Sequence, residues 1–512
     1  MNTNNLDVEK IIEINGQMDK ETMEKVVGVL DPRGINRNPF NFKPFSKEYK
    51  FGAETNKFDL KGLSEKEIKK LYESEKGKGW MYGKVYKERN LFFSKLLQSQ
   101  VMLVVAGTGT GKTVAIPKLL AHYFGYKKKI LITIPTIKAV VSASGYAAAC
   151  MDVKLGEHIG HATGYEKKMM SWTKLVYCTT GYALAYMTGN PDLDDVSAII
   201  IDEAHYREIA GDMLMSMACN LILRRPDFKL IIMSATITPK PFEDYFNKIG
   251  VIYQLYEPMG AAANYKIEHL FQQKPVKIDK IPDKMIETIK KLLQTTKKGH
   301  IVGFVTAGGQ AKTIFNAIKE DIIKNKNKYK SIPWCHILES KTVKEIEEIS
   351  TGKKTYIGEP DISGKVEKWD RKLILATEAV EASVTFGKDK VDNYGVDYVI
   401  ESGIKFGVNY DPIRNLNVKG NRFVTQANIG QRCGRTGRTG DGYCIRMYTE
   451  EEFNNMPVDR LPQIEGADIT AELIRLIGLP SIKTFTKANN FFNDIVALPP
   501  PECVTAATFS SL

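Results

Sequence analysis

Short apolar runs alternate with helix-length segments from about Lys87 onward. In the first half of the chain these runs are VMLVVAG, KILITIP, KLVYCTT, SAIIIDEAH and KLIIMSAT, each bounded by glycine, proline or polar residues. Runs this short, rich in β-branched residues and separated by helices, are typical of strands that are buried on both faces. The pattern therefore predicts an α/β unit in which helices cover both faces of a parallel sheet.

The alternation stops near EPMGAAANY and resumes with HIVGFVT, RKLILAT, VDYVIES and GYCIRMY, which predicts a second α/β unit of similar size. Before the first unit the chain mixes Lys and Glu with Asn, Gly and Pro. After the second unit its pattern is mostly helical, as in ADITAELIRLIGL. The predicted regions are an N-terminal extension at 1–85, α/β units at 86–258 and 259–448, and a helical region at 449–512.

The chain is basic: of its 512 residues, 72 are Lys or Arg and 60 are Asp or Glu, so the formal net charge is +12. Such an excess favours polyanionic partners such as nucleic acids, although it also occurs in proteins that bind none. The N-terminus lacks the apolar segment of a signal peptide, and no run reaches the ~18 apolar residues that span a bilayer. These features predict a soluble intracellular protein without a membrane partner, in the cytoplasm rather than the nucleus.

The seven cysteines are scattered, form no CxxC pair and are odd in number. Disulfide frameworks and zinc sites normally show paired spacings. The sequence therefore predicts reduced, structural thiols. The cysteines are Cys150, Cys178, Cys219, Cys335, Cys433, Cys444 and Cys503.

The sequence AGTGTGKT at 106–113 follows the first apolar run and opens a helical segment. Glycines let successive backbone N–H groups turn toward phosphate oxygens, and the helix N-terminus adds a favourable dipole. In this pattern Lys112 contacts the β- and γ-phosphates and the Thr113 hydroxyl binds Mg²⁺. The strict pattern has Gly where Ala106 stands, and the alternative is a Gly-rich turn that binds nothing. The predicted nucleotide-binding residues are Gly107, Thr108, Gly109, Thr110, Gly111, Lys112 and Thr113.

Two carboxylates, Asp202 and Glu203, follow the run SAIII, at the strand end where open α/β sheets bind ligands. We expect Asp202 to hold Mg²⁺ directly or through water, and Glu203 to orient and deprotonate the attacking water. The alternative is that both carboxylates only cap a helix. The predicted metal ligands are Thr113, Asp202 and Glu203.

The segment QRCGRTGR in the second unit supplies Gln431, Arg435 and Arg438. Phosphoryl transfer builds charge on the γ-phosphate oxygens, and arginines from a separate unit can stabilise it. We expect these three residues to be catalytic, so that nucleotide binding brings the units together and hydrolysis lets them separate. The alternative is a basic loop that contacts a nucleic-acid backbone.

With AGTGTGKT, DEAH, SAT and QRCGRTGR in this order, the chain resembles superfamily 2 helicases of the DEAH/DExH class over about residues 85–500. PTIKAV at 135–140, TKLVYCTTGYAL, VGFVTAGGQ and ATEAVEASVTF at 376–386 are similar to further motifs of that family. The resemblance implies two tandem RecA-like domains. It also implies that one group of residues couples hydrolysis to unwinding and another contacts the nucleic-acid backbone with little sequence specificity. The coupling residues are His205, Ser234 and Thr236, and the contact residues are Pro135, Thr136, Lys138, Thr179 and Thr377.

The segment GIKFGVNYDPIRNLNVKGNRFVTQ has β-rich arms around an Asn/Gly-containing turn. By likeness to the family it is the β-hairpin that separates the strands of a duplex, with its tip at 415–420. The alternative is an ordinary surface hairpin.

The chain also departs from the family pattern. PTIK stands where cellular DEAH proteins usually have PRR, which is nearer to the flaviviral and poxviral groups, and EAVEAS stands where NIAETS is usual. Together with the abundance of Lys, Asn and Ile, this agrees with a viral origin. Family members complete a winged helix and add a helical ratchet domain beyond the point where this sequence ends. We therefore expect a partial winged-helix-like region at the C-terminus and reduced processivity.

The predicted function is an ATP-dependent RNA helicase or translocase that uses ATP and Mg²⁺ and acts on single-stranded RNA or on a duplex with an overhang. Two alternatives stay open. The first is a DNA helicase or DNA-dependent translocase, because discrimination rests on 2′-OH contacts that the sequence does not show. The second is an NTP-switched RNA clamp without processive unwinding.

Overall fold

The structure is a computed structural model of the 512-residue chain. It describes residues 64, 66–67, 83–107, 110–234, 239–258, 265–338, 370–378, 394–437, 440–479 and 482–511. The chain divides into two compact units, one formed by Met1–Ala261 with Leu461–Leu512 and the other by Ala262–Arg460. The region boundaries expected from the sequence stay predictions, and most of the expected N-terminal extension lies outside the described residues.

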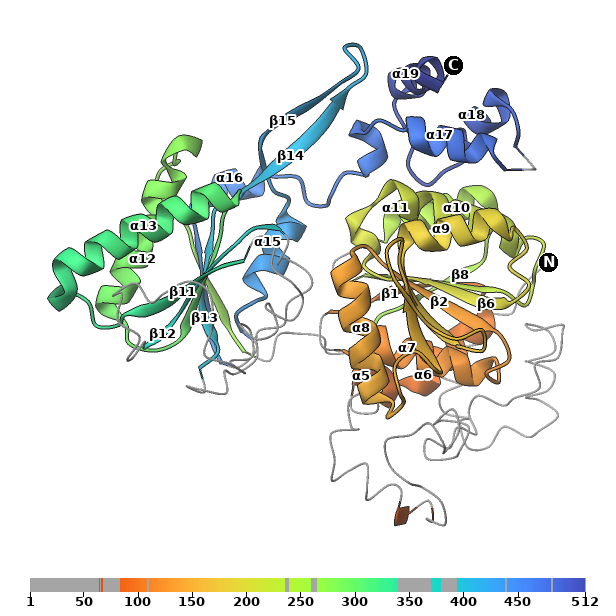
Figure 1. The fold of residues 1–512 in the computed structure, drawn as a ribbon, viewed down its shortest axis with the longest axis horizontal. Coiled ribbons are helices and arrows are strands. Elements are labelled where there is room, and N and C mark those ends of the chain that lie inside the picture. Colours follow the sequence, from red (N-terminus) through yellow and green to blue (C-terminus); the bar gives the residue numbers. More distant parts are fainter. Residues whose placement is uncertain are drawn as a thin grey trace. The chain divides into compact units, whose positions relative to one another are not determined.

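The first unit contains an eight-stranded sheet with the strand order β4-β3-β5-β2-β6-β7-β1-β8 (Figure 1). Neighbouring strands are parallel except β3 and β4, which are antiparallel. The strands are β1 (Val101–Val105), β2 (Lys129–Ile134), β3 (Ile159–Ala162), β4 (Lys167–Lys168), β5 (Leu175–Thr179), β6 (Val196–Ile201), β7 (Lys229–Ser234) and β8 (Tyr253–Tyr256).

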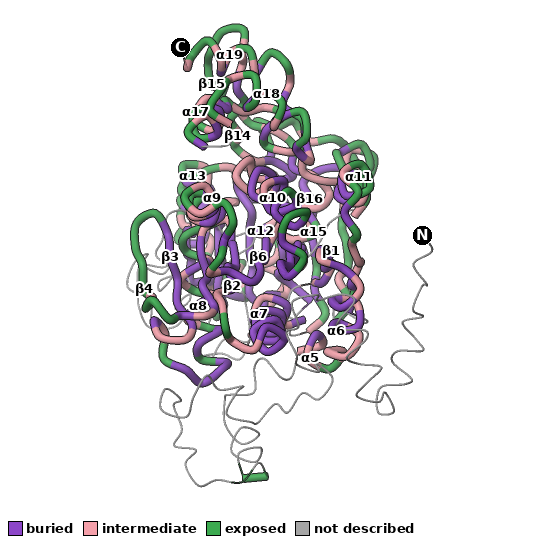
Figure 2. Tube along the Cα trace, turned by 90° about the vertical axis from the view of Figure 1, so that its right-hand side faces the viewer, coloured by how far each residue is buried: buried purple, intermediate pink, exposed green. Residues whose placement is uncertain are grey.

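Helices cover both faces of this sheet, because alternate residues of a strand point to opposite sides. Met102 and Val104 of β1 share a core with α5 to α8, whereas Val101 and Leu103 share a core with α9 to α11. Strands β2 and β6 and helix α7 are almost wholly buried (Figure 2). The helices are α5 (Lys84–Lys87), α6 (Arg89–Gln98), α7 (Lys112–Tyr123), α8 (Ile137–Cys150), α9 (Thr180–Gly189), α10 (Ile209–Ile222) and α11 (Lys240–Ile249).

The C-terminal segment of the chain returns to the first unit. The Gln463 backbone N–H donates a hydrogen bond to the Arg207 carbonyl oxygen over 2.9 Å. Three helices that follow add apolar side chains to the same core as α9 to α11. They are α17 (Thr470–Ile477), α18 (Phe485–Asn493) and α19 (Pro501–Ser511), and their core residues include Leu473, Leu476, Phe492 and Ala507.

The second unit contains a six-stranded, fully parallel sheet with the order β11-β12-β10-β13-β16-β9. One face packs against α12 and α13 and the other against α15. The strands are β9 (Ile267–Leu270), β10 (His300–Phe304), β11 (Pro333–Leu338), β12 (Arg371–Ala376), β13 (Val396–Glu401) and β16 (Gly442–Arg446). The helices are α12 (Ile281–Thr295), α13 (Gly308–Asn325), α15 (Gln426–Cys433) and α16 (Glu450–Asn454).

The expected α/β fold with two parallel sheets is confirmed, and each of the nine apolar runs forms a strand. The sequence did not reveal β3, β4, β8, β9 and β11. Four of these five lie at sheet edges. The edge strands β4, β8 and β9 are largely exposed or half-buried and so lack an apolar pattern, whereas β11 is buried throughout.

Strands β14 (Ile404–Asp411) and β15 (Leu416–Phe423) form the expected antiparallel hairpin, but its predicted tip was wrong. Asp411 pairs with Leu416, so the turn consists of residues 412–415, and residues 416–420 belong to β15. The Asp411 carboxylate fixes this turn by accepting hydrogen bonds from the N–H groups of Ile413 and Arg414, both over 3.1 Å.

Within the described part of the chain, no helix combines the length and the apolar composition that a bilayer crossing requires.

Candidate functional site

The glycine-rich loop joins β1 to the N-terminus of α7, as the sequence predicted. Gly111 precedes the helix with φ of 85°, a left-handed conformation that glycine adopts without steric cost. Helix α5 approaches this loop so closely that a Cβ atom on Gly83 would lie 2.6 Å from the Thr110 carbonyl oxygen. The Thr110 hydroxyl also donates a hydrogen bond to the Gly107 carbonyl oxygen over 2.9 Å. Two of the predicted loop residues, Thr108 and Gly109, lie outside the described residues.

Lys112 and Thr113, the first residues of α7, meet Asp202 at the end of β6. The Lys112 ammonium lies 3.1 Å from Asp202 Oδ1 and 3.4 Å from Glu203 Oε1. The Thr113 hydroxyl donates a hydrogen bond to Asp202 Oδ2 over 2.6 Å. Burial opposes the charged form of Lys112, but the two carboxylates outweigh this effect and raise its pKa above the ordinary value. The site therefore keeps a buried cation next to two carboxylates and a hydroxyl.

Glu203 has a strained backbone, with φ of 57° and ψ of 38° in the left-handed region that non-glycine residues seldom occupy. Arg207 has a similar conformation on the other side of the short 3₁₀ turn between them. Each such residue costs about 1–3 kcal/mol, and such strain is concentrated at functional sites. The Glu203 side chain keeps 21% of its surface exposed, whereas that of Asp202 is buried. Glu203 can therefore reach a solvent molecule that Asp202 cannot.

His205 connects the acidic segment to the end of β7. Its Nδ1 atom lies 3.0 Å from the Ser234 hydroxyl and 3.4 Å from Glu203 Oε2. The Ser234 carbonyl oxygen accepts a hydrogen bond from the Ala106 N–H over 2.9 Å, so this strand end also touches the glycine-rich loop. A movement of the Glu203 side chain can therefore be transmitted through the His205 ring to β7, the strand that precedes Thr236. Thr236 itself lies outside the described residues.

The expected nucleic-acid contacts in the first unit lie on neighbouring strands. Thr136 follows β2 and caps α8 by accepting a hydrogen bond from the Ala139 N–H. Thr179 ends β5 and caps α9 in the same way, from the Tyr182 N–H. Strands β2 and β5 are paired in parallel, so both helix N-termini lie at one edge of the sheet. Helix N-termini favour anions, which suits phosphate groups.

Pro135 and Lys138 flank Thr136, and Lys138 is exposed. A small cavity connects this edge to the acidic segment, and its lining includes Pro135, Thr180, Asp202, Glu203 and Glu208. Burial raises the pKa of Glu208 to about 7, although a hydrogen bond with Thr180 acts in the opposite direction. The sequence gave no separate reason to select Glu208, because one more acidic residue after DEAH has no distinctive spacing.

In the second unit the motif QRCGRTGR forms the end of α15 and the loop after it. Gln431 is partly exposed, Arg435 is buried, and Arg438 lies outside the described residues. Arg432 plays a structural part that the sequence did not reveal. Its guanidinium lies 2.8 Å from Glu401 Oε1, and both side chains are almost fully buried. This ion pair joins α15 to the end of β13 and holds the motif on its sheet.

Thr377 directly follows β12, and its N–H donates a hydrogen bond to the Leu338 carbonyl oxygen over 3.3 Å. It therefore lies at a strand end of the second sheet, as expected. The rest of the motif at 379–386 lies outside the described residues.

The expectation that all seven cysteines are reduced was wrong for one pair. The structure joins Cys433, at the end of α15, to Cys444 of β16 by a disulfide, with a Cα–Cα distance of 5.6 Å. The five other cysteines take part in no disulfide and are buried. The sequence could not show this pairing, because the two residues meet only when α15 packs on the sheet.

Comparison with known proteins agrees with this architecture. Residues 88–245 match the family described as DEAD/DEAH box helicase. This match identifies a DEAD/DEAH box helicase domain in the first unit, and the predicted resemblance is confirmed.

Two curated proteins are similar to most of the chain. The protein named "Putative ATP-dependent RNA helicase L540" of Acanthamoeba polyphaga mimivirus is 30% identical over 482 residues, which cover 93% of this chain and 62% of that protein. The pre-mRNA-splicing factor ATP-dependent RNA helicase prp22 of Schizosaccharomyces pombe is 29% identical over 430 residues, covering 83% of this chain and 34% of that protein. The chain thus spans less than two thirds of either relative.

Solved structures show the same fold. The crystal structure of the Escherichia coli DEAH/RHA helicase HrpB superposes with a TM-score of 0.66 at 19% identity, covering 83% of this chain and 49% of that one. The assignment of two RecA-like sheets is therefore confirmed.

Proposed function

We propose that this chain is an ATP-dependent RNA helicase or translocase. The observation that carries the proposal is the convergence of Lys112, Thr113, Asp202 and Glu203 at the carboxyl ends of β1 and β6. A buried cation, a hydroxyl and two carboxylates of different exposure are the groups that bind a triphosphate and activate water. The names of the two relatives add RNA as the substrate.

The residues also suit a divalent cation. The Thr113 hydroxyl and the Asp202 carboxylate offer oxygen ligands, which Mg²⁺ prefers. The hydrogen bond of 2.6 Å between them brings the two oxygen atoms close enough to contact one ion. Mg²⁺, when bound, neutralises phosphate charge and orients the γ-phosphoryl group. Thr113 and Asp202 would hold the ion, with Glu203 beside them.

In the proposed reaction Lys112 binds the β- and γ-phosphates of ATP, and backbone N–H groups of the glycine-rich loop donate hydrogen bonds to the phosphate oxygens. Glu203 accepts a proton from the attacking water as the water approaches the γ-phosphorus atom. Gln431, Arg435 and Arg438 of the second unit stabilise the charge that builds on the transferred group. The His205–Ser234 contact transmits the change from Glu203 to β7.

RNA is proposed to run along the strand ends that carry Pro135, Thr136, Lys138, Thr179 and Thr377. Two helix N-termini, threonine hydroxyls and one exposed lysine offer hydrogen bonds and charge to phosphates. Binding should therefore depend mainly on the RNA backbone.

The first test is the ATPase rate with single-stranded RNA or DNA of the same sequence, measured over a series of salt concentrations. We expect RNA to raise the rate and DNA to raise it less, because contacts with 2′-OH groups add to the shared phosphate contacts. Stimulation should fall as salt rises, since cations compete for the phosphates. Equal or greater stimulation by DNA would favour a DNA-dependent translocase, and stimulation that is independent of salt would contradict backbone binding.

The second test addresses the β14–β15 hairpin, which carries apolar side chains that are about half exposed or more, including Phe406, Val408, Ile413 and Val418. Replacement of residues 412–415 with a Gly-Ser turn of equal length should leave RNA-stimulated ATPase intact and lower duplex unwinding several-fold, because the tip would no longer separate the strands. A gel-based unwinding assay measures this effect.

A matched control replaces the exposed residues Lys326–Lys328 of the same unit with a Gly-Ser turn of equal length. Unwinding should then stay at the level of the unchanged protein. Full unwinding by the 412–415 variant would show that the hairpin is an ordinary surface feature.

A further inference from the structure

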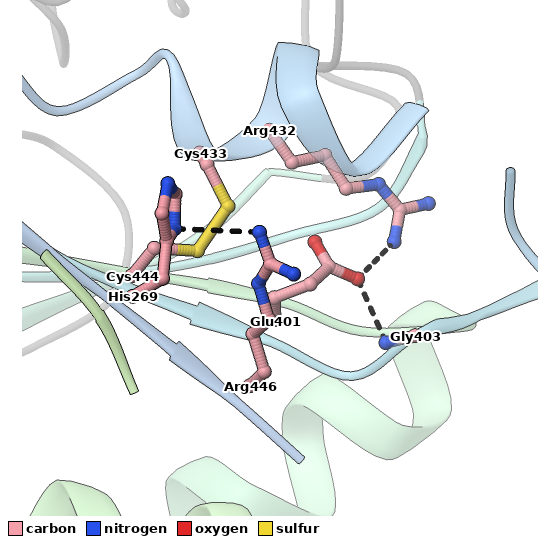
Figure 3. Close-up of a disulfide and its surroundings, with 7 residues drawn as sticks. All are labelled: His269, Glu401, Gly403, Arg432, Cys433, Cys444 and Arg446. Carbon is pink, nitrogen blue, oxygen red and sulfur yellow. Dashed lines mark hydrogen bonds and ion pairs between the residues drawn. A yellow bond between two sulfur atoms is a disulfide. The ribbon is translucent and has the colours of Figure 1, made fainter. Parts of the chain in front are cut away.

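The disulfide between Cys433 and Cys444 encloses the arginine loop, residues 434–441, which joins α15 to β16. Cys433 is the last residue of α15, and Cys444 is the central residue of β16, eleven positions later (Figure 3). Between them lie Arg435 and the turn at Gly437, which has φ of 70°. The bond therefore connects both ends of the loop from which an arginine would reach a phosphate.

The pair lies beside the edge of the second sheet. Both cysteines are buried, with exposures of 2% for Cys433 and 0% for Cys444, but β9 beside them is an edge strand and its His269 is exposed. The Arg446 guanidinium contacts His269. Its central carbon lies 4.6 Å from the centre of the Phe271 ring and 4.1 Å from the centre of the Phe453 ring.

A metal site is the rival interpretation, because a ligand atom of His269 lies within 4.8 Å of both sulfur atoms. The contact between Arg446 and His269 opposes it. A guanidinium has only donors, so at 3.3 Å it must donate to the lone pair of Nδ1. The ring is then neutral with its proton on Nε2, and neither nitrogen has a lone pair left for a metal ion. The set is therefore better suited to redox chemistry than to metal binding.

We propose that Cys433 and Cys444 are a reversible redox pair that controls the arginine loop, a regulation that rests on the proposed ATPase function. A peroxide oxidises one thiolate to a sulfenic acid as its O–O bond breaks. The other thiolate attacks that sulfur, the S–S bond forms, and the oxygen leaves as water. In total two thiols and one hydrogen peroxide give one disulfide and two water molecules, and a dithiol reductant reverses the change.

The closed form restricts the arginine loop. A cross-link between residues this close in sequence removes conformations that the open loop can adopt. An arginine that stabilises the γ-phosphate must approach as charge builds and withdraw after hydrolysis. We therefore expect the oxidised protein to have an ATPase kcat several-fold lower than the reduced protein.

The experiment treats the full chain with hydrogen peroxide and then counts free thiols in denaturant. The reduced chain has seven thiols, and loss of two, with Cys433 and Cys444 found in one cross-linked peptide by mass spectrometry, is the expected result. RNA-stimulated ATPase should fall after oxidation and return after dithiothreitol. Cys444→Ala should lose the sensitivity to peroxide while keeping its activity, whereas the matched Cys178→Ala, a change at another buried cysteine, should stay sensitive.

Three results would overturn the proposal. One is a count of seven thiols after peroxide treatment. Another is stoichiometric zinc in the purified protein that Cys444→Ala lacks, which would make the cluster a metal site. The third is a cross-linked protein whose ATPase is unchanged. If the reduced protein shows no ATPase at all, the proposed function fails, and the thiol count still decides whether the bond forms.

Discussion

Lys112→Ala should weaken ATP binding by about 30-fold or more, because truncating one partner of a buried charge pair costs about 2–5 kcal/mol. The ammonium is the one cation within 3.4 Å of both carboxylates in the described part of the site. Its removal takes away the positive charge for the phosphates and leaves Asp202 and Glu203 to repel them. Titration with a fluorescent ATP analogue measures the loss, and ATP turnover should fall to background.

A misfolded protein would give the same loss, so the variant needs a control. Lys129→Ala removes another ion-paired lysine, 2.8 Å from Asp195, at the opposite end of the sheet from the glycine-rich loop. ATP binding by this variant should match the unchanged protein. Thermal unfolding of both variants would show that each still folds cooperatively. Normal ATP turnover by a folded Lys112→Ala protein would end the phosphate-binding assignment.

Glu203→Gln should still bind ATP and RNA but turn over at least about 100-fold more slowly, which is the usual contribution of a positioned general base. The amide keeps the shape of the side chain and its distance to the phosphate site, but it cannot accept the proton of the attacking water. Single-turnover ATP hydrolysis separates this defect from binding.

Glu157→Gln is a matched control for that change. The Glu157 side chain has 20% exposure, close to the 21% of Glu203, and it also pairs with a lysine, Lys154, over 3.2 Å. Its turnover should be unchanged. If Glu203→Gln hydrolysed ATP at nearly the original rate, another group would have to activate the water.

Most of the site could be predicted from the sequence because its parts are local. The glycine-rich loop and the acidic segment each follow a strongly apolar strand, and β1 and β6 are parallel members of one sheet with their carboxyl ends at the same edge. The contact of Lys112 with Asp202, 90 positions apart, follows from that geometry.

The features that the sequence did not reveal depend on tertiary packing. The Arg432–Glu401 pair and the Cys433–Cys444 bond both arise where α15 packs against the second sheet, and neither has a distinctive spacing. The hairpin tip was misplaced because the Asn and Gly residues of β15 suggest a turn, whereas the Asp411 side chain fixes the chain reversal earlier. Edge strands such as β9, with mostly exposed residues, give no apolar pattern to detect.

The return of the C-terminal helices to the first unit has a consequence for synthesis of the protein. The apolar surface of α10 and α11 is completed by side chains that the ribosome makes only after residue 461, once the whole second unit has been translated. During that interval the growing chain lacks the part of this core that α17 to α19 supply, so apolar side chains of the first unit stay less covered. The core of the first unit can therefore be completed only after the second unit has been made.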